Sequence, residues 1–186
     1  MGKLAVFFPG IGYNTDKPLL YYSRKIAAKC GYEVKLLPYG GFPQKIRGDR
    51  EKMKECYELA LLQSREMLST VSFEMYSEVL LTGKSIGTVV AAAIGAEISS
   101  GVKVRQLLYT PLEETFMFPI GEAIAFTGSA DPWTGKGKSR IPELCSQNGI
   151  PCCVIPDANH SLETEDPLED LKNLRKIMKQ SLAFIS

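Results

Sequence analysis

LLTGKSIG, at residues 80–87, is the stretch that decides how this chain is expected to fold. An apolar run leads into it, and the small-residue stretch TVVAAAIG at residues 88–95 follows at once. A Gly-x-Ser-x-Gly motif between a strand and a helix is typical of a nucleophile elbow, the sharp turn that exposes a reactive serine. Gly83 and Gly87 supply the small residues that this turn requires, because a Cβ at either position would meet the neighbouring strand or helix. The N-terminus of the following helix is expected beneath Ser85, where it favours negative charge on the reacting oxygen.

The same stretch contains Gly-Lys-Ser, a sequence that also occurs in phosphate-binding loops. Such a loop needs a further glycine five residues before Gly83, at position 78. Glu78 stands there, so a carboxylate would lie where phosphate should bind. We therefore favour the elbow over the phosphate loop.

Length and composition indicate a single soluble domain over residues 1–186. Hydrophobic residues make up 45% of the chain and charged residues 23%, which is ordinary for a globular protein. The net charge of +1, without any basic run, argues against nucleic-acid binding. The apolar segment before Pro9 is too short for a signal peptide or a membrane span, so we expect neither.

The chain has five cysteines, an odd number without a leading signal sequence, which indicates reduced thiols in a cytoplasmic protein. There is no Cys-x-x-Cys pair, and the single histidine cannot complete a Cys/His zinc site. The sequence therefore implies no metal and no cofactor. Cys152 and Cys153 are adjacent within a predicted strand, where burial as small hydrophobic residues explains them.

Strand and helix patterns alternate along the whole chain. Nearly continuous apolar runs, typical of buried parallel strands, predict strands at residues 3–8, 33–37, 77–82, 102–109, 122–126 and 151–155. Helices are predicted from residue 15 or 16 to 31, from 50 to 69, from the elbow to 99, from 139 to 148 and from 166 onward. For the last helix we expect Asp166 as the N-cap, Pro167 as the first residue and Glu169 completing a capping box.

This alternation predicts an α/β fold, a doubly wound and mainly parallel six-stranded sheet flanked by helices. The expected strand order is 2-1-3-4-5-6, with no lid domain. Ser85 should then lie near the switch point between the first and third strands, where the order of the strands reverses.

A reactive serine needs a base, and His160 is the single histidine of the chain. It follows the last predicted strand, whereas Asp131 follows the fifth, and both should reach the edge where Ser85 lies. The order serine, acid, histidine is that of α/β-hydrolases. His160 would take the proton of Ser85 and pass it to the leaving group. Asp131 would hold the imidazole in the required tautomer.

Backbone amides are the expected donors to the oxyanion that forms when the serine attacks. They would come from Ile86, after the nucleophile, and from Ile11, in the loop after the first strand. Gly10 would let the backbone approach the substrate closely. A dinucleotide-binding interpretation of the glycines at 10 and 12 fails, because Thr15 occupies the position of the third glycine.

Other residues could supply the acid, and Asp131 could have another role. Glu113 and Glu114, which follow the fourth predicted strand, and Asp157 are rival candidates for the acid. Asp131 is followed by Pro132, so it could instead simply start a turn.

The aromatic and sulfur-containing residues near these loops also have two interpretations. Trp133, Phe116 and Met117 are either core residues or, if exposed beside Ser85, the walls of an apolar acyl pocket. Met53 belongs to the apolar face of the predicted helix over residues 50–69.

With these motifs the chain resembles a small, lidless α/β-hydrolase, similar in organisation to dienelactone hydrolase-like proteins and compact carboxylesterases. The resemblance covers nearly the whole chain. It implies a serine hydrolase that cleaves an ester or thioester of a small, accessible substrate through an acyl-enzyme. Two residues depart from the family pattern. Pro9 stands where many relatives have a histidine, and Lys84 stands where histidine, tyrosine or an acid is more common.

The expected partner is therefore a small acyl substrate, with no nucleic acid and no membrane, and a homodimer stays open. An acyltransferase or a carbon–carbon bond hydrolase could use the same triad. A non-catalytic ligand-binding protein could be built on the same scaffold, because fold does not determine activity. Turnover of a short acyl ester is the observation that separates an enzyme from a binding protein.

Overall fold

The computed structural model describes residues 2–46, 48–134 and 139–186. Its strands are β1 (Gly2–Phe8), β2 (Tyr32–Leu36), β3 (Tyr76–Lys84), β4 (Lys103–Tyr109), β5 (Glu122–Gly128) and β6 (Cys152–Ile155). They form one sheet in the order β2-β1-β3-β4-β5-β6, and every neighbouring pair is parallel. The predicted fold class and strand order are confirmed, including the reversal between β1 and β3.

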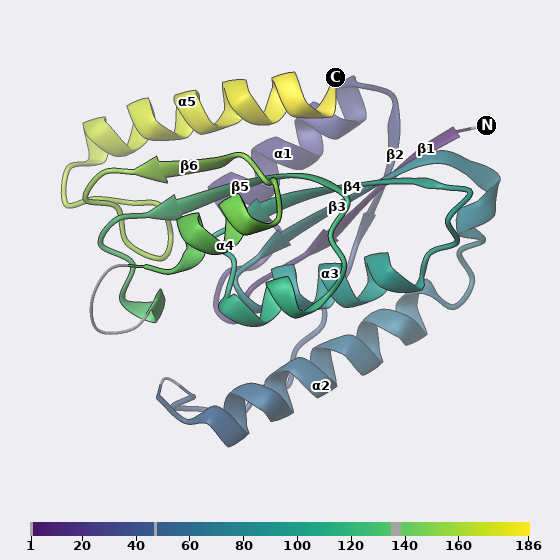
Figure 1. Cartoon of the computed structure of the whole chain (residues 1–186), viewed down its shortest axis with the longest axis horizontal. Helices are drawn as coiled ribbons and strands as arrows, with labels where there is room; N and C mark the ends of the chain where they lie inside the picture. Colours follow the sequence, from purple (N-terminus) through teal and green to yellow (C-terminus); the bar gives the residue numbers. More distant parts are fainter. Residues whose placement is uncertain (1, 47, 135–138) are drawn as a thin grey trace.

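Helices cover both faces of this sheet (Figure 1). The α-helices of the described residues are α1 (Pro18–Lys29), α2 (Arg50–Leu68), α3 (Ile86–Glu97), α4 (Ile141–Gln147) and α5 (Pro167–Ile185). Short 3₁₀ turns are η1 (Phe73–Met75), η2 (Glu113–Met117) and η3 (Pro132–Thr134). The helices α1 and α5 lie on one face, whereas α2 and α3 lie on the other.

Burial on both faces explains the nearly continuous apolar runs of the strands. In β1, Ala5 and Phe7 pack toward α1 and α5, whereas Leu4, Val6 and Phe8 pack toward α2 and α3. All five residues are buried, because each face of a central parallel strand is covered by helices. A third cluster lies under α4, where Ala125 of β5 packs near Ile141 and Cys145.

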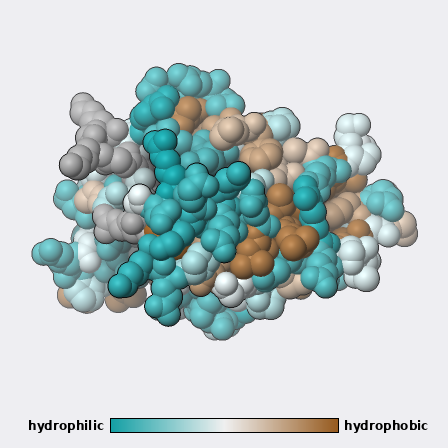
Figure 2. Space-filling view, turned by 90° about the horizontal axis from the view of Figure 1, so that it is seen from below, coloured by the Kyte–Doolittle hydropathy of each residue, from teal (hydrophilic) through white to brown (hydrophobic). Residues whose placement is uncertain are grey.

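The outer surface of the α2 and α3 side is mostly hydrophilic, with apolar residues between the polar ones (Figure 2). Within the described ranges, no helix combines the length and the apolar character needed to cross a membrane.

The first helix begins later than predicted. Asn14 Oδ1 accepts the N–H of Asp16 at 3.1 Å, and the carbonyl of Asn14 accepts the N–H of Lys17 at 3.2 Å. These bonds hold residues 14–17 in a turn, a role that asparagine commonly has. The helix α1 therefore starts at Pro18, whose missing N–H suits the first helical position.

The predicted capping box at α5 is wrong, although its N-cap and first residue are as expected. Asp166 accepts the N–H of Leu168 at 2.9 Å. Glu169 pairs instead with Lys172 at 2.9 Å. Thr164 Oγ1 already accepts the N–H of Asp166 at 3.2 Å, and this is the donor that a capping box would have satisfied.

Candidate active site

Ser85 lies between the end of β3 and the start of α3, with φ 56° and ψ −125°. A serine rarely adopts this conformation, so the surrounding bonds must hold it. Its N–H donates to the carbonyl of Tyr109 at 3.0 Å. Its carbonyl accepts both the N–H and the hydroxyl of Thr88, at 2.8 and 2.7 Å. The turn thus has the strained geometry that a nucleophile elbow requires.

The two glycines of the motif allow the neighbouring backbones to touch. A Cβ on Gly83 would lie 2.6 Å from the carbonyl oxygen of Gly87 and 2.7 Å from Thr88 Cα. A Cβ on Gly87 would overlap the carbonyl oxygen of Phe8 and lie 2.6 Å from that of Pro9. Backbone cannot give way as a side chain can, so only glycine fits at either position.

The hydroxyl of Ser85 is the first member of a continuous hydrogen-bond chain. Its Oγ lies 2.7 Å from Nε2 of His160, and Nδ1 of His160 lies 2.7 Å from Oδ2 of Asp131. The three side chains come from the ends of β3, β6 and β5, which meet at one edge of the sheet. With a proton on Nδ1 donated to Asp131, Nε2 is free to accept from the serine hydroxyl.

Among the acids considered, Asp131 is the one that contacts the histidine. Its side chain is 1% exposed, and its Oδ1 also accepts the N–H of Trp133 at 2.9 Å. Glu113 is exposed and accepts from Arg140 at 3.0 Å. Asp157 is exposed as well. The structure therefore brings Asp131, Ser85 and His160 together and leaves these rival acids elsewhere.

The environment of His160 favours its neutral form. Burial lowers the pKa of the imidazole, and the positive charge of Lys84 lowers it further. The hydrogen bond and the charge of Asp131 act in the opposite direction, but the pKa still ends below its ordinary value. A neutral imidazole at neutral pH is the form that can accept a proton from serine.

The predicted oxyanion donors lie on either side of Ser85. Ile86 is the first residue of α3, and the first N–H groups of a helix have no acceptor within it. Ile11 lines the cavity beside Ser85. A Cβ on Gly10 would lie 3.0 Å from the carbonyl oxygen of Lys84 and 3.3 Å from Ser85 Cβ, so Gly10 allows this loop to approach the nucleophile. The oxyanion hole itself stays a prediction.

A cavity of about 230 Å³ opens beside the serine. Its lining residues are Ile11, Gly12, Tyr13, Ile46, Met53, Lys84, Ser85, Trp133, His160 and Ser161. The ring of Trp133 stands 5.5 Å from that of His160, measured between centroids. Trp133 is therefore at the place predicted for a substrate contact.

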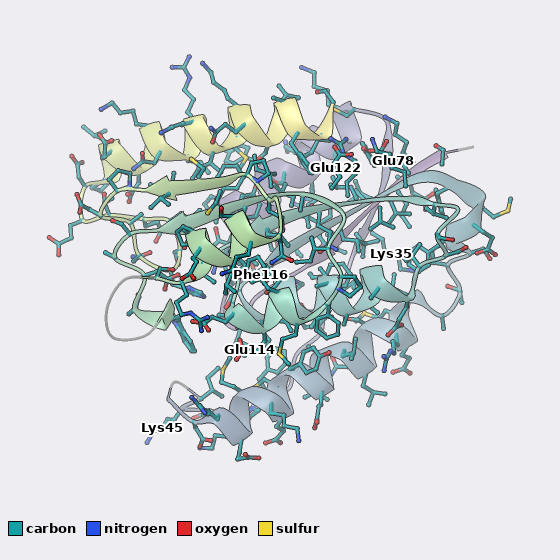
Figure 3. All side chains as sticks on the ribbon, viewed as in Figure 1. Lys35, Lys45, Glu78, Glu114, Phe116 and Glu122 are labelled. Atoms are coloured by element: carbon teal, nitrogen blue, oxygen red, sulfur yellow. The ribbon has the colours of Figure 1, made fainter. Side chains whose placement is uncertain are left out.

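Phe116 and Met117 do not line this cavity. Phe116 is partly buried in the cluster of α4, and Figure 3 shows it between α3 and α4. Met117 is 80% exposed. The short turn η2 carries both residues away from Ser85, so the structure does not bring them to the acyl pocket that the sequence suggested.

Sequence reasoning missed several wall residues. Tyr13 and Ile46 come from loops, and Met53 comes from the first turns of α2, where its apolar spacing indicated only a core face. Lys84 stood out as a departure from the family pattern, yet nothing in the sequence indicated that it would be buried. No group of three or more His, Cys, Asp or Glu side chains in the described ranges is placed to hold a metal ion.

No protein-family model and no curated protein matches this sequence. Solved structures do resemble it. One is an alpha-beta serine hydrolase homologue from Coxiella burnetii, with a TM-score of 0.68 and 12% identity over 100% of this chain and 85% of that one. Another is an a/b serine hydrolase without lid from Xanthomonas campestris, with a TM-score of 0.60 and 13% identity over 97% of this chain and 81% of that one.

A structure from the study of two Rhizomucor miehei esterases has a TM-score of 0.53 and 16% identity, over 100% of this chain and 75% of that one. At such identities the likeness shows the fold and leaves the activity open. The chain therefore has the α/β-hydrolase fold, and in its architecture it is similar to the small, lidless serine hydrolases.

Proposed function

We propose that this protein is a serine hydrolase that cleaves an ester or thioester of a small, accessible substrate. The observation that carries the proposal is the unbroken chain of 2.7 Å contacts from Ser85 through His160 to Asp131. A serine with a base in hydrogen-bond contact, and a third group orienting that base, is the arrangement of covalent catalysis. The structural neighbours, which include esterases, agree with the proposed hydrolase function.

The reaction follows from the positions of the three side chains. Ser85 Oγ attacks the substrate carbonyl while Nε2 of His160 takes its proton. The negative charge on the carbonyl oxygen is expected to meet the N–H groups of Ile86 and Ile11. Asp131 stabilises the imidazolium, which then gives its proton to the departing alcohol or thiol. Water, deprotonated by His160, attacks the acyl-enzyme and releases the acid.

The surroundings of the triad suit a small substrate. The cavity volume of about 230 Å³ is below the range of roughly 300–1,000 Å³ typical of drug-sized ligands. Tyr13, Met53 and Trp133 form apolar parts of its wall. These side chains would hold the hydrocarbon part of the acyl or alcohol group.

The test is covalent labelling by a fluorophosphonate probe, combined with turnover of p-nitrophenyl acetate. The wild-type protein should be labelled on Ser85, and Ser85→Ala should lose labelling and about 10⁴-fold or more in kcat. Ser77→Ala is the matched control, because Ser77 is an exposed serine at the opposite end of β3. Labelling that persists on another serine in Ser85→Ala, or unchanged turnover, would remove the basis for the proposal and favour a binding protein.

A further inference from the structure

Lys84 is a buried cation beside the nucleophile that the hydrolase mechanism leaves unused. The residue is 1% exposed and lines the same cavity as Ser85. Its Nζ lies 5.0 Å from the centroid of the Tyr13 ring, which is the favourable contact that the structure gives it. No hydrogen bond or ion pair to an acceptor holds this ammonium among the described residues. A buried ammonium without an acceptor is costly, so its presence calls for an explanation.

The charges that face Lys84 do not provide that acceptor. Asp131, after β5, and Glu163, before α5, attract the ammonium at a distance, but Asp131 is bonded to His160 and Glu163 is exposed. Tyr13 and His160 are the other titratable groups beside it. Burial outweighs both acids and lowers the pKa of Lys84 to about 7. The side chain is therefore close to its titration midpoint at neutral pH.

The cavity wall near Lys84 is suited to an anion of small size. Its residues in the described ranges include neither Asp, Glu nor Arg, so a ligand carboxylate would contact one cation and no carboxylate of the wall. Lys84 Nζ is not among the described polar atoms that are sealed from solvent without a partner, so it reaches the cavity that the residue lines. A single ammonium balances a single negative charge, which fits a carboxylate better than a phosphate dianion.

We propose that Lys84 recognises a carboxylate carried by the substrate, so that the preferred substrate is a small acidic ester or thioester such as a half-ester of a short dicarboxylic acid. This inference rests on the proposed hydrolase function for the ester part of the ligand. The carboxylate supplies the acceptor that the ammonium lacks, and Lys84 is adjacent in the chain to Ser85, so the recognised group lies near the attacked carbonyl. A hydrogen bond to a charged group is expected to favour the acidic ligand by about 10- to 100-fold.

Binding should also take up a proton. Above neutral pH the free lysine is mostly uncharged, whereas a bound carboxylate favours the ammonium. The complex then holds more protons than the free protein and ligand together. A ligand without the carboxylate has no such effect.

The experiment measures binding to Ser85→Ala, which does not turn the ligand over. Monomethyl glutarate and its neutral counterpart dimethyl glutarate are titrated calorimetrically at about pH 8, in two buffers that differ in ionisation enthalpy. We expect the half-ester to take up about one proton and to bind up to about 10-fold more tightly at this pH, because protonating the free lysine one unit above its pKa of about 7 offsets about tenfold of the preference. Adding Lys84→Met, which keeps the side-chain volume and removes the charge, should abolish both the preference and the proton uptake.

Equal affinity for the half-ester and the diester, or a preference that survives Lys84→Met, would overturn the role of Lys84. If Lys84→Met does not fold, as judged by circular dichroism, Lys84→Gln replaces it. If neither variant folds, binding of the half-ester to Ser85→Ala without proton uptake would overturn the role of Lys84. The proposed function is tested separately by the probe. Labelling of Ser85 without a preference for the half-ester would overturn only the proposed role of Lys84. A preference for the half-ester without labelling would overturn only the proposed hydrolase function.

Discussion

Ser85 keeps a positive φ because the elements around it leave no other conformation. Residues held in sparsely populated backbone regions cost about 1–3 kcal/mol each and persist only where the structure over-determines them. Here the bonds to Tyr109 and Thr88 fix the turn, and the close contacts of Gly83 and Gly87 fix the strand and helix on either side. This strained turn holds the hydroxyl of Ser85 2.7 Å from Nε2 of His160.

The acid can be tested by a change of one atom. Asp131→Asn keeps the shape of the side chain but presents an amide, which favours the wrong imidazole tautomer of His160. We expect kcat to fall by about 10³- to 10⁴-fold while the fold is retained. Glu113→Gln is the control, because Glu113 is exposed and bonded to Arg140, and its kcat should change less than twofold, that is by about 0.4 kcal/mol or less in the barrier. Steady-state kinetics that rank the two variants the other way would place the acid after β4.

One buried arginine, Arg105, connects the C-terminal end of helix α5 to the sheet. Arg105 of β4 bonds Glu78 of β3 at 3.0 Å and Glu122 of β5 at 2.9 Å. It also donates to the carbonyl of Phe184 in the last turn of α5. Figure 3 shows Glu78 and Glu122 near this end of the helix. A cation is favourable there, because the C-terminus of a helix carries partial negative charge.

Arg105→Met should therefore be strongly destabilising. The variant leaves the carbonyl of Phe184 without this donor and removes the cation from the mostly buried Glu78 carboxylate, which keeps the hydroxyl of Tyr32. Removing one partner of a buried ion pair costs about 3–5 kcal/mol. The matched control is Arg65→Met, which breaks the exposed pair of Arg65 with Glu97 between α2 and α3 and should cost about 1 kcal/mol or less. Urea unfolding measures both. Equal losses in the two variants would show that Arg105 contributes no more than a surface pair.

For the whole molecule, the site depends on residues that only the sheet brings together. Ser85, Asp131 and His160 come from three loops at one edge, and Lys84 lines the same cavity as Ser85 and His160. Burial by this assembly lowers the pKa of His160, and the charge of Lys84 adds to the shift. The titration of the site is thus a property of the folded chain.

The lowered pKa of His160 predicts how kcat/KM should vary with pH. The imidazole must be neutral to accept the serine proton, so activity should rise with pH and reach its midpoint below the ordinary histidine pKa of about 6.5. Replacing Lys84 by Met removes a like charge and should move this midpoint upward. His160→Gln should abolish this rise of activity with pH. Stopped-flow acylation with p-nitrophenyl acetate would check this, and a wild-type midpoint above 6.5 would mean that Asp131 outweighs burial.

Local patterns were enough to predict the sheet and the candidate triad. Alternating apolar runs and helical segments predicted the strand order, together with the rule that the site of such a sheet lies where the order of the strands reverses. The spacing of Gly83, Ser85 and Gly87 predicted the elbow, because the turn itself demands small residues at those positions. Asp131 and His160 followed from their places after strands, and the structure sets His160 against Ser85 and Asp131 against His160.

Packing between distant segments decided what the local patterns could not. Thr164 occupied the donor that Glu169 was predicted to satisfy, and η2 turned Phe116 away from the cavity. The sequence left the direction of the His160 pKa shift open, because Asp131 raises it and burial lowers it. Only the folded chain shows that burial is larger and that Lys84 adds to it. The order of the residues along the chain determined that Ser85, Asp131 and His160 could come together. How deeply they are buried, and hence the pKa of His160, depends on how much of their surface the whole fold removes from water.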